Sequence, residues 1–598
     1  MNITPNKLSI AQLFATVNEQ FIVPSYQRRY AWGFNQHLAL FEDIDMLKEN
    51  DGHLFGMIII HTSYHTGGLN QPELVDGQQR MTTLVILLKA IRDLFAEIGK
   101  PEKVSEIDNM LKCKGLDDIR KSKIKLGELD NPDIENLLIS NDTKDMTNDN
   151  IAYAYQNFKK WLGEYEFEEL NRFYFKLTNI AVIIRLDVGM AQDAYKLFET
   201  INNRGLKLTP TDIIKNFLLG HAAKIDTDQT LEKVKGLWSQ IIINLNDLDT
   251  DDFLRHFICA TLQRKVSFSN LIYEFKKYYL KNIKKAELLG EYSYYENELF
   301  EESEEDDEEV ENSEEGETQQ TDTKISLVTF LTKLKALSLT YKKISKNHFE
   351  DIKINRRVEN LNKILSKPTY IFLMHFLQHE GYGVKEKIKV LKYLEGLMLR
   401  RHICESRTNE NDDIFSRMVS FLDNGDDLLS NIKAFIEESE YMPDNDDFCE
   451  SLPKYEFKGK LIDRAKYMLA SIEYFKRGNT NELIVSSSGE VEIEHIIPQT
   501  INTKKSKNEF GDWETYLGNN AFAKHKKHVN LIGNMTLLGE SLNIIATNNP
   551  FKRKKASYKK SSFRITAELD DYTDFKFNSV VKRGELFAEL AVKIWPQS

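Results

Sequence analysis

The sequence has few cysteines and no long apolar run. Its four cysteines, spread over 598 residues, form no Cys-x-x-Cys pair, which argues against zinc ribbons and a disulfide framework. No apolar run reaches the roughly 18–20 residues that a membrane span requires, and no charged-then-apolar leader opens the chain. A Gly-x-x-x-x-Gly-Lys-Ser/Thr loop is also missing, so a bound nucleotide would not sit in a P-loop. These absences predict a soluble protein of a reducing cytoplasm that has no membrane partner.

Positive charge is scarce overall, since 80 Lys and Arg face 92 Asp and Glu and give a formal net charge of −12. Such an acidic balance is unusual for a protein that binds nucleic acid. However, the segment Glu291–Glu317 carries fifteen acidic residues and no Lys or Arg, and without those fifteen charges the chain would carry +3. We expect a disordered, solvated linker over 291–322, with mimicry of DNA as the less favoured alternative.

At 598 residues and 69.6 kDa, the chain is longer than one hydrophobic core supports, which predicts three or four domains. Short β-rich runs alternate with helical patterns up to about residue 220, and helical periodicity dominates from there to about Ile436. The fold class that we predict is therefore multidomain α+β, with a mixed α/β N-terminal domain and a largely helical middle.

A cluster of polar residues that could take part in catalysis lies near the C-terminus. The run from Val491 to Ile497 indicates a β-strand that carries the pair Glu494-His495. Leu531–Leu538 predicts a second strand, and the residues from Glu540 onward predict a helix with a basic end.

Hydrolysis of a phosphodiester with one hard cation requires oxygen ligands and a base that activates water. Glu494 and Asn543 could supply the oxygens, and His495 the base. The alternative is that His495 is a satisfied core histidine and that the asparagines are turn residues.

In order and spacing, this stretch resembles the HNH, or ββα-metal, nucleases, in which an acidic residue and a His end the first strand. Asn534 and Asn543 are nine residues apart, the separation that this family keeps between its hairpin Asn and its helix ligand. The resemblance implies that His495 is the general base and that Glu494 and Asn543 are metal ligands. It also implies that Asn534 braces the hairpin and that Lys554 is the family's trailing lysine.

Two features depart from that pattern. The helix ligand is Asn rather than His, which favours Mg²⁺ or Mn²⁺ over Zn²⁺ because oxygen donors suit hard ions. A long insertion, Gln499–Asn530, separates the two strands. Basic residues in the insertion and behind the hairpin predict contacts with the phosphates of double-stranded DNA. These residues are Lys524, Lys526, Lys527, Lys552 and Arg553.

The N-terminal region contains a second candidate site. Phe55–His61 indicates a buried strand, and Pro72–Thr83 follows it with an Asp76-Gly77 turn before a predicted helix over Leu84–Ile98. Free N–H groups at a helix start, with Arg80 beside them, can bind an anion. An ordinary helix capped by Asp76 explains the same residues equally well.

The motifs Tyr26-Gln-Arg-Arg29 and Asp76-Gly-Gln-Gln-Arg80 resemble the ParB/sulfiredoxin-like N-terminal domain of the GmrSD-type, type IV restriction enzymes. The resemblance extends to the turn Asn203-Arg204-Gly205. It implies that this domain binds or hydrolyses a nucleoside triphosphate (NTP), or reads modified DNA. The candidate residues are Tyr26, Gln27, Arg28, Asp76, Gly77, Gln78, Arg80, Asn203 and Arg204.

Taken together, the two resemblances imply a sensing domain over 1–222, a helical middle domain over 223–440 and an HNH nuclease domain over 441–598. Such a chain would be a modification-dependent restriction endonuclease that cleaves invading phage DNA with Mg²⁺ or Mn²⁺, regulated by an NTP. The alternatives are a nucleotide-switched DNA-binding scaffold that does not cleave, or a nuclease that senses phosphorothioated DNA. A homodimer is left open as the oligomeric state.

Overall fold

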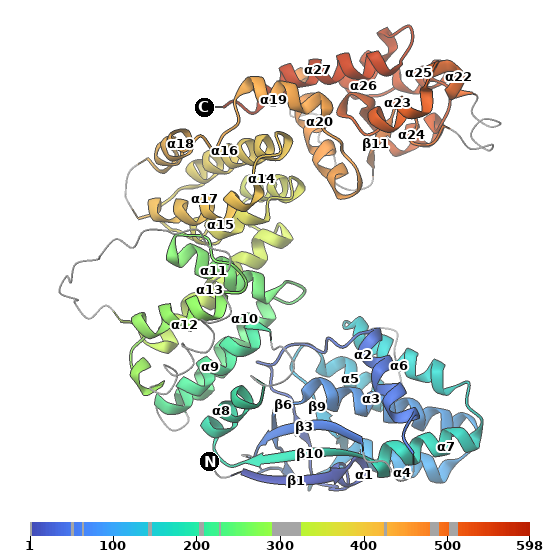
Figure 1. The fold of residues 1–598 in the computed structure, drawn as a ribbon, viewed down its shortest axis with the longest axis vertical. Helices are drawn as coiled ribbons and strands as arrows, with labels where there is room; N and C mark the ends of the chain where they lie inside the picture. Colours follow the sequence, from blue (N-terminus) through green and yellow to red (C-terminus); the bar gives the residue numbers. More distant parts are fainter. Residues whose placement is uncertain are drawn as a thin grey trace. The chain divides into compact units, whose positions relative to one another are not determined.

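The protein is described by a computed structural model, which covers residues 3–48, 53–62, 65–140, 146–202, 209–225, 229–289, 324–423, 427–478, 490–501 and 512–597. The predicted acidic linker, 291–322, lies outside these residues. The chain folds into two compact units. Unit 1 comprises Met1–Leu254 and Ser267–Leu339, and unit 2 comprises Arg255–Val266 and Thr340–Ser598. Helices account for 64% of the structure and the sheets are small (Figure 1), which agrees with the predicted multidomain α+β class.

Unit 1 is built around a six-stranded mixed sheet with the strand order β1-β10-β3-β6-β2-β9. The strands are β1 (Ile3–Ser9), β2 (Phe21–Ile22), β3 (His53–His61), β6 (Glu73–Asp76), β9 (Ile124–Lys125) and β10 (Ala181–Val188). β10 pairs antiparallel with β1 and parallel with β3, and β3 pairs antiparallel with β6. The strand predicted at Phe55–His61 is confirmed as most of β3. Two short ribbons, β4–β5 (His65–Thr66, Leu69–Asn70) and β7–β8 (Lys112–Lys114, Arg120–Ser122), complete the strands of this unit.

The long helix α3 (Gln78–Glu97) supplies much of the apolar core beside this sheet. It packs against α4 (Pro101–Leu111) and α6 (Asp149–Leu162), and Figure 1 shows these helices together at one side of the strands. The other helices around the sheet are α1 (Ile10–Leu13), α2 (Phe34–Asp45), α5 (Asn131–Glu135), α7 (Phe167–Phe175) and α8 (Ala191–Asn202).

The start of α3 corrects the prediction from sequence. The helix begins at Gln78, six residues before the predicted Leu84. Gly77 is its N-cap, in the left-handed conformation with φ of 90°, and no side chain caps the helix. Gln and Arg are good helix formers, so the polar residues that indicated a turn form the first helical turn instead.

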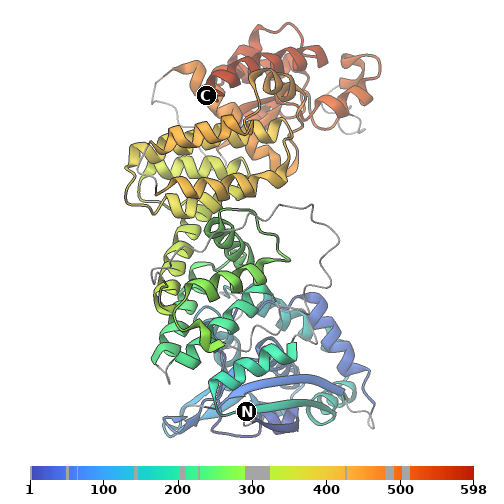
Figure 2. The same cartoon turned by 60° about the vertical axis from the view of Figure 1, so that its left-hand side comes forward.

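The rest of the described chain before residue 490 is helical, as predicted for the middle region. Unit 1 adds α9 (Pro210–Ile225), α10 (Gln229–Asn244) and α12 (Leu271–Asn282), while α11 (Thr250–Leu262) and α13 (Leu327–Lys346) contribute residues to both units. Unit 2 continues with α14 (Ile352–Lys363), α15 (Tyr370–Phe376), α16 (Val384–Ile403), α17 (Asn411–Met418), α18 (Leu428–Glu438), α19 (Asn445–Ser451) and α20 (Ile462–Arg477). α16 packs against α14 and α18, and Figure 2 shows the yellow helices of this region running side by side. No described helix is long and apolar enough to span a bilayer.

The C-terminal part of unit 2 contains a two-stranded hairpin, β11 (Val491–His495) and β12 (Met535–Gly539). Short helices surround it: α22 (Trp513–Leu517), α23 (Ala521–His528), α24 (Glu540–Ala546), α25 (Phe551–Tyr558) and α26 (Arg564–Ala567), followed by the long α27 (Phe577–Ile594). Their apolar side chains form one core under the hairpin, which includes Trp513, Phe551 and Tyr558.

Two boundaries here differ from the sequence prediction. The second strand begins at Met535 rather than Leu531, because residues Ile532–Asn534 form a 3₁₀ turn. The single helix predicted after Gly539 is two helices, α24 and α25. Thr547 has φ of 36°, outside the right-handed helical region, and Pro550 precedes α25, so the chain turns between them.

Gly533, in the 3₁₀ turn that precedes β12, permits a close approach of α27. A Cβ at this position would overlap the carbonyl oxygen of Val580 and lie 2.8 Å from the backbone nitrogen of Gly584. Because both neighbours are backbone atoms of one helix, only a shift of α27 or of the turn would relieve the overlap.

We predict that Gly533→Ala destabilises unit 2 by about 1–3 kcal/mol or more, the usual range for overpacking a buried site. The matched control is Gly396→Ala in α16, where a Cβ would meet Trp595 at an ordinary 3.7 Å. This control should be neutral or stabilising, since Ala is the better helix former. Thermal unfolding followed by circular dichroism compares the two, and equal midpoints would contradict the close packing at Gly533.

Candidate functional site

The pair Glu494-His495 ends strand β11, and its cross-strand partners are Thr536 and Met535. Side chains alternate between the two faces of a strand, so Glu494 shares its face with Glu492 while His495 projects from the opposite face. The hairpin is antiparallel and in continuous register over all five pairs. The predicted acid and base are therefore held by one rigid element.

Glu494 is buried and paired. One carboxylate oxygen, Oε1, accepts hydrogen bonds from Lys554 Nζ at 2.6 Å and from the Tyr558 hydroxyl at 2.9 Å. Lys554 is fully buried, and burial lowers its pKa while the neighbouring carboxylate opposes that change. Its Nζ also donates to the carbonyl oxygen of His495 at 2.9 Å. Lys554 thus joins both residues of the predicted catalytic pair to helix α25.

The imidazole of His495 is mostly buried, and its Nε2 lies 3.4 Å from the Gln499 amide. Burial, together with the nearby Lys554 and His525, lowers the pKa of His495 to about 4. The ring is consequently neutral at pH 7 and able to accept a proton. His525 is held in turn by the carbonyl oxygen of Pro498, 2.7 Å from its Nε2.

Asn534 is completely buried, and its side-chain amide is bonded on both sides. Its Oδ1 accepts from the backbone N–H of Ile497 at 2.8 Å, and its Nδ2 donates to the carbonyl oxygens of Ile497 and Val529, each at 2.9 Å. These bonds tie the chain that follows His495 to the turn before β12. The geometry is that of a brace between the end of β11 and the start of β12.

Asn543 lies on α24, where its Nδ2 donates to Glu492 Oε2 at 2.6 Å. Glu492 was not predicted as a site residue. The alternation Val491-Glu492-Ile493-Glu494 was a signal for it, since residues two apart share one face of a strand. The amide bond to Glu492 fixes the orientation of Asn543.

The chemistry of the donors fits a hard cation, although the described residues contain no cluster of three or more His, Cys, Asp or Glu side chains arranged for a metal. Within the described residues, neither Glu494 Oε2 nor Asn543 Oδ1 makes a hydrogen bond, so each keeps an oxygen to offer. Mg²⁺ is commonly held by one or two protein oxygens together with waters and substrate phosphate. Glu494 and Asn543, the two predicted ligands, each provide an oxygen atom of this type.

Arg583, on α27, binds the backbone at the start of β12. It was not predicted as a site residue from the sequence. Its buried guanidinium donates to the carbonyl oxygens of Met535 at 2.6 Å, Gly533 at 3.1 Å and Ile565 at 3.1 Å. Burial lowers the pKa of Arg583 to about 10. Arg583 directly follows Lys582 in an amphipathic helix, so nothing in the sequence indicated that its side chain would bind backbone carbonyls.

The residues predicted to contact DNA lie on two helices and are all exposed. Lys524, Lys526 and Lys527 belong to α23, and Lys552 and Arg553 belong to the first turn of α25. In contrast, the adjacent arginines Arg400 and Arg401 are buried in α16. Arg400 donates to four acceptors from the backbone and from Asn445, so its role is structural.

In unit 1, a pocket of about 820 Å³, including space open to solvent, lies at the start of α3. It brings together six of the residues that were predicted for this site, namely Gln27, Arg28, Asp76, Gly77, Gln78 and Arg80. Trp32, Phe198, Thr209, Asp212 and Lys215 line it as well. Asn203 and Arg204, from the same prediction, lie outside the described residues.

Gly77 is required where the strand turns into the helix. Its φ is 90°, and a Cβ there would lie 2.5 Å from Ile58 Cγ2. The first residues of α3, Gln78, Gln79 and Arg80, line the pocket, and the backbone N–H groups at a helix start have no acceptor within the helix. Gln78 is buried, and its Oε1 has no hydrogen-bond partner.

Arg80 packs its guanidinium on the backbone of Gly56 and donates to the carbonyl oxygen of Met57 at 2.7 Å. Burial lowers the pKa of Arg80, with the carboxylate of Asp76 opposing the change. Burial raises the pKa of Asp76, and Gly77, Arg80 and Lys215 counter that effect. The pocket therefore holds a guanidinium with an acidic group beside it.

Lys215, on α9, is an additional buried cation that sequence reasoning missed. Its Nζ donates to Gln27 Oε1 at 2.5 Å and to Asp212 Oδ1 at 3.0 Å. Burial would raise the pKa of Asp212, but Lys215 and Arg28 hold it below its usual range. The i, i+3 spacing of Asp212 and Lys215 was a local signal for an ion pair, but not for its position in this pocket.

The structure places Tyr26 outside the residues that line the pocket. Its buried hydroxyl donates to Glu73 and lies 3.3 Å from the Tyr195 hydroxyl. Lys235 completes this cluster with an ion pair to Glu73 at 2.9 Å. The predicted role of Tyr26 in binding has no support from this geometry, because its polar atom is already satisfied inside the core.

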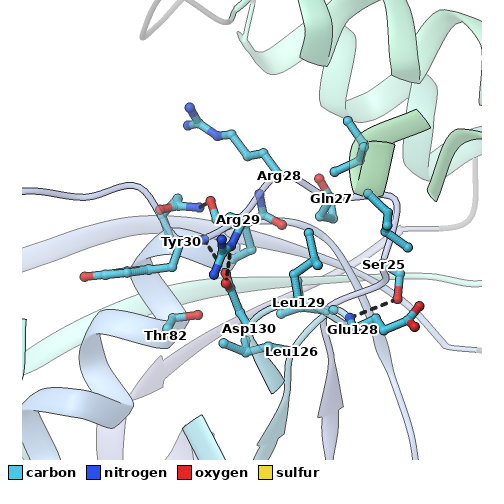
Figure 3. Close-up of a pocket in the computed structure, with 16 residues that line it drawn as sticks. Ser25, Gln27, Arg28, Arg29, Tyr30, Thr82, Leu126, Glu128, Leu129 and Asp130 are labelled. Atoms are coloured by element: carbon cyan, nitrogen blue, oxygen red, sulfur yellow. Dashed lines mark hydrogen bonds and ion pairs between the residues drawn. The ribbon is translucent and has the colours of Figure 1, made fainter. Parts of the chain in front are cut away.

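A smaller, neighbouring pocket of about 430 Å³ shares Gln27, Arg28, Gln78 and Gln79 with the first. Figure 3 shows Arg29 turned toward Asp130, with Arg28 extending away from that pair. Arg29 Nε donates to Asp130 Oδ1 at 2.6 Å, so Arg29 fastens the loop, whereas Arg28 is 44% exposed. Of these two adjacent arginines, Arg28 is the one placed to meet a ligand.

Comparison with known families gave two matches. The model described as GmrSD restriction endonuclease, N-terminal domain, matches residues 10–219, which include the pocket at α3. The model described as GmrSD restriction endonucleases, C-terminal domain, matches residues 442–590, which include the hairpin. No curated protein matches the chain significantly.

We predict that Lys554→Met destabilises the hairpin region by about 3–5 kcal/mol, because it leaves a buried carboxylate without its cation. Lys552→Met, two residues away on the exposed side of α25, should change stability by about 0.5 kcal/mol at most. Adding Glu494→Gln to Lys554→Met should restore part of the loss. Hydrogen–deuterium exchange of peptides from β11 and α25 measures the effect, and equal protection in the two single variants would refute it.

Proposed function

The chain belongs to the GmrSD-type restriction endonucleases, and from that premise we propose that it is a modification-dependent, type IV member. In this proposal it cleaves invading phage DNA by metal-dependent hydrolysis of phosphodiesters. The N-terminal domain has the ParB-like fold and senses the DNA or a nucleotide, and the C-terminal domain is an HNH nuclease. The observation that carries the proposal is the hairpin that presents Glu494 and His495 at the end of β11, with Asn543 of the following α24 bonded to Glu492 of the same strand.

In the proposed reaction His495 is the general base. Its pKa of about 4 leaves the ring neutral at pH 7, and the phosphodiester monoanion of bound DNA would raise that pKa toward the working range. His495 would take a proton from the attacking water, which forms a bond to phosphorus as the bond to the 3′-oxygen breaks. Asn534 keeps the segment after His495 in place through its bonds to Ile497.

Glu494 Oε2 and Asn543 Oδ1 would hold Mg²⁺ or Mn²⁺. The ion would supply charge stabilisation for the phosphoryl oxygens and the leaving group. Lys554 occupies the other oxygen of Glu494 and limits that residue to one ligand atom. Lys524, Lys526, Lys527, Lys552 and Arg553 would hold the flanking phosphates of the duplex.

The pocket at the start of α3 supports the proposal that an NTP regulates the enzyme. Arg28 and Arg80 can bind phosphate oxygens, and the first N–H groups of α3 add backbone donors. Trp32 and Phe198 offer flat apolar surface in the same wall. The second candidate function for this pocket is direct reading of the DNA modification, which the same aromatic and cationic groups also favour.

His495→Ala should lower the rate of DNA cleavage by about 10²–10⁴-fold, the usual contribution of a general base, while DNA binding stays near wild type. The measurement is single-turnover nicking of phage DNA that the wild type cleaves, with binding followed by fluorescence anisotropy. His348→Ala, an exposed histidine on the chain before α14, is the control and should cleave at the wild-type rate.

Chelation by EDTA should abolish cleavage by the wild type, and Mg²⁺ or Mn²⁺ should restore it. If His495→Ala nicks DNA as fast as His348→Ala does, His495 is not the base. A wild type that binds DNA but never nicks it, with any metal, would favour the non-cleaving scaffold instead.

Arg80→Ala should weaken NTP binding by about 1.5–3 kcal/mol, or roughly tenfold to a hundredfold in affinity, because a charge-assisted contact to phosphate is lost. Calorimetric titration of each NTP into the protein provides the test. Arg120→Ala, at the exposed first residue of strand β8, should bind as the wild type does.

Arg80→Lys adds a sharper comparison, since it keeps the charge but loses the fork that binds two oxygens at once. We expect intermediate affinity for this variant. If NTP affinity is the same in Arg80→Ala and wild type while the preference for modified DNA disappears, the pocket reads the modification and not the nucleotide.

A further inference from the structure

Helix α24 exposes two adjacent isoleucines next to the candidate catalytic centre. Ile544 is 71% exposed and Ile545 is 63% exposed. The inward side of this helix is formed by Ala546, which is buried, and by Leu542, which packs against the core under the hairpin. The outward face of α24 is thus apolar although it does not pack into the interior. An exposed apolar surface beside a candidate site is typical of a binding surface.

The loop that follows holds this face rigidly. The N–H of Thr547 bonds to the carbonyl oxygen of Asn543 at 2.9 Å, and Asn549 Nδ2 donates to the carbonyl oxygen of Ile545 at 3.0 Å. The buried indole of Trp513 donates to the carbonyl oxygen of Asn548 at 2.9 Å. The two isoleucines therefore stand on a fixed end of α24 rather than on a loose loop.

Their surroundings match a polyanion. Asn543, the proposed metal ligand, directly precedes Ile544 in α24. α25 packs against α24 and presents Lys552 and Arg553, both exposed, in its first turn. A duplex placed to bring a phosphate to Asn543 would have its backbone near these cations and its base edges near the isoleucines.

We propose that Ile544 and Ile545 form an apolar wedge that inserts between base pairs of the DNA duplex at the cleavage site. The proposal rests on the proposed nuclease function. Apolar side chains that enter a base step unstack it in part and kink the duplex, and the cost is offset by the contacts that the bend permits. The wedge would position the scissile phosphate, so these residues are positioning residues and not catalytic ones.

The test uses the nuclease-inactive His495→Ala protein with nicked plasmid that DNA ligase seals in its presence. A wedge that unstacks base pairs unwinds the plasmid, which appears as a shift in topoisomers after the protein is removed. We expect this shift with His495→Ala and its loss when Ile544→Ala and Ile545→Ala are added. Ile352→Ala, at the 83% exposed first residue of α14, is the matched control and should leave the shift unchanged.

Binding measured at several salt concentrations separates the wedge from the charges. The double alanine variant should bind the same DNA about tenfold to a hundredfold more weakly with an unchanged salt slope, since burial of apolar surface is lost and no phosphate contact. Lys552→Ala with Arg553→Ala should instead reduce the slope. Alanine is a better helix former than isoleucine, so the double variant should be at least as stable as its parent.

Equal unwinding with and without the isoleucines would overturn the wedge while the nuclease proposal stands, provided that the wild type nicks the DNA. A double variant that keeps its unwinding but changes its sedimentation would overturn it in favour of contact between two copies of the chain. If the wild type nicks no DNA with any metal, both proposals fail together.

Discussion

The buried ion pair between Lys554 and Glu494 is the interaction on which the candidate catalytic hairpin depends. Lys554 is fully enclosed, so its ammonium has no access to water and must find all its acceptors inside the protein. It takes them from Glu494 and from the carbonyl oxygen of His495, while Tyr558 adds a second donor to the same carboxylate oxygen. Helix α25, strand β11 and the segment after it are thereby held in one arrangement. The same pair decides which oxygen of Glu494 remains available for a ligand.

The sequence predicted the hairpin well because its information is local. The β-rich run around Glu494-His495 and the Asn534–Asn543 spacing lie within short segments whose periodicity is visible directly. It did not predict that Asn534 lies in a 3₁₀ turn, which packs closely against α27 through Gly533, because that contact joins segments distant in the sequence. Nor did it predict the break at Thr547, whose positive φ is unusual for a β-branched residue and is held by bonds around it. Tertiary packing overrides local propensity at both positions.

The pocket in unit 1 shows which binding residues could not be predicted from local sequence. Arg28, Asp76 and Arg80 were recognised through motifs that are compact in sequence, and the structure gathers them in one wall. Lys215 and Asp212 belong to a helix more than a hundred residues later in the chain, and no pattern in that helix indicates which side chains face a pocket. Tyr26 is the opposite case, since its place within a recognised motif suggested contact with a ligand, whereas its hydroxyl is satisfied by Glu73. Motif membership identified the region, and only packing identified the side chains.

Both candidate sites solve the problem of an enclosed cation in the same way. Lys215 is paired with Asp212, and Lys554 with Glu494, so each buried lysine is neutralised inside the protein. The exposed cations nearby stay partly hydrated: Lys552 and Arg553 in one unit, and in the other Arg28, which is 44% exposed and lies 3.8 Å from Asp212. It follows that salt should weaken ligand binding through the exposed groups far more than it disturbs either buried pair, because screening acts on charges that water reaches. In each unit, therefore, a buried lysine stabilises the fold and exposed cations are available to bind a ligand.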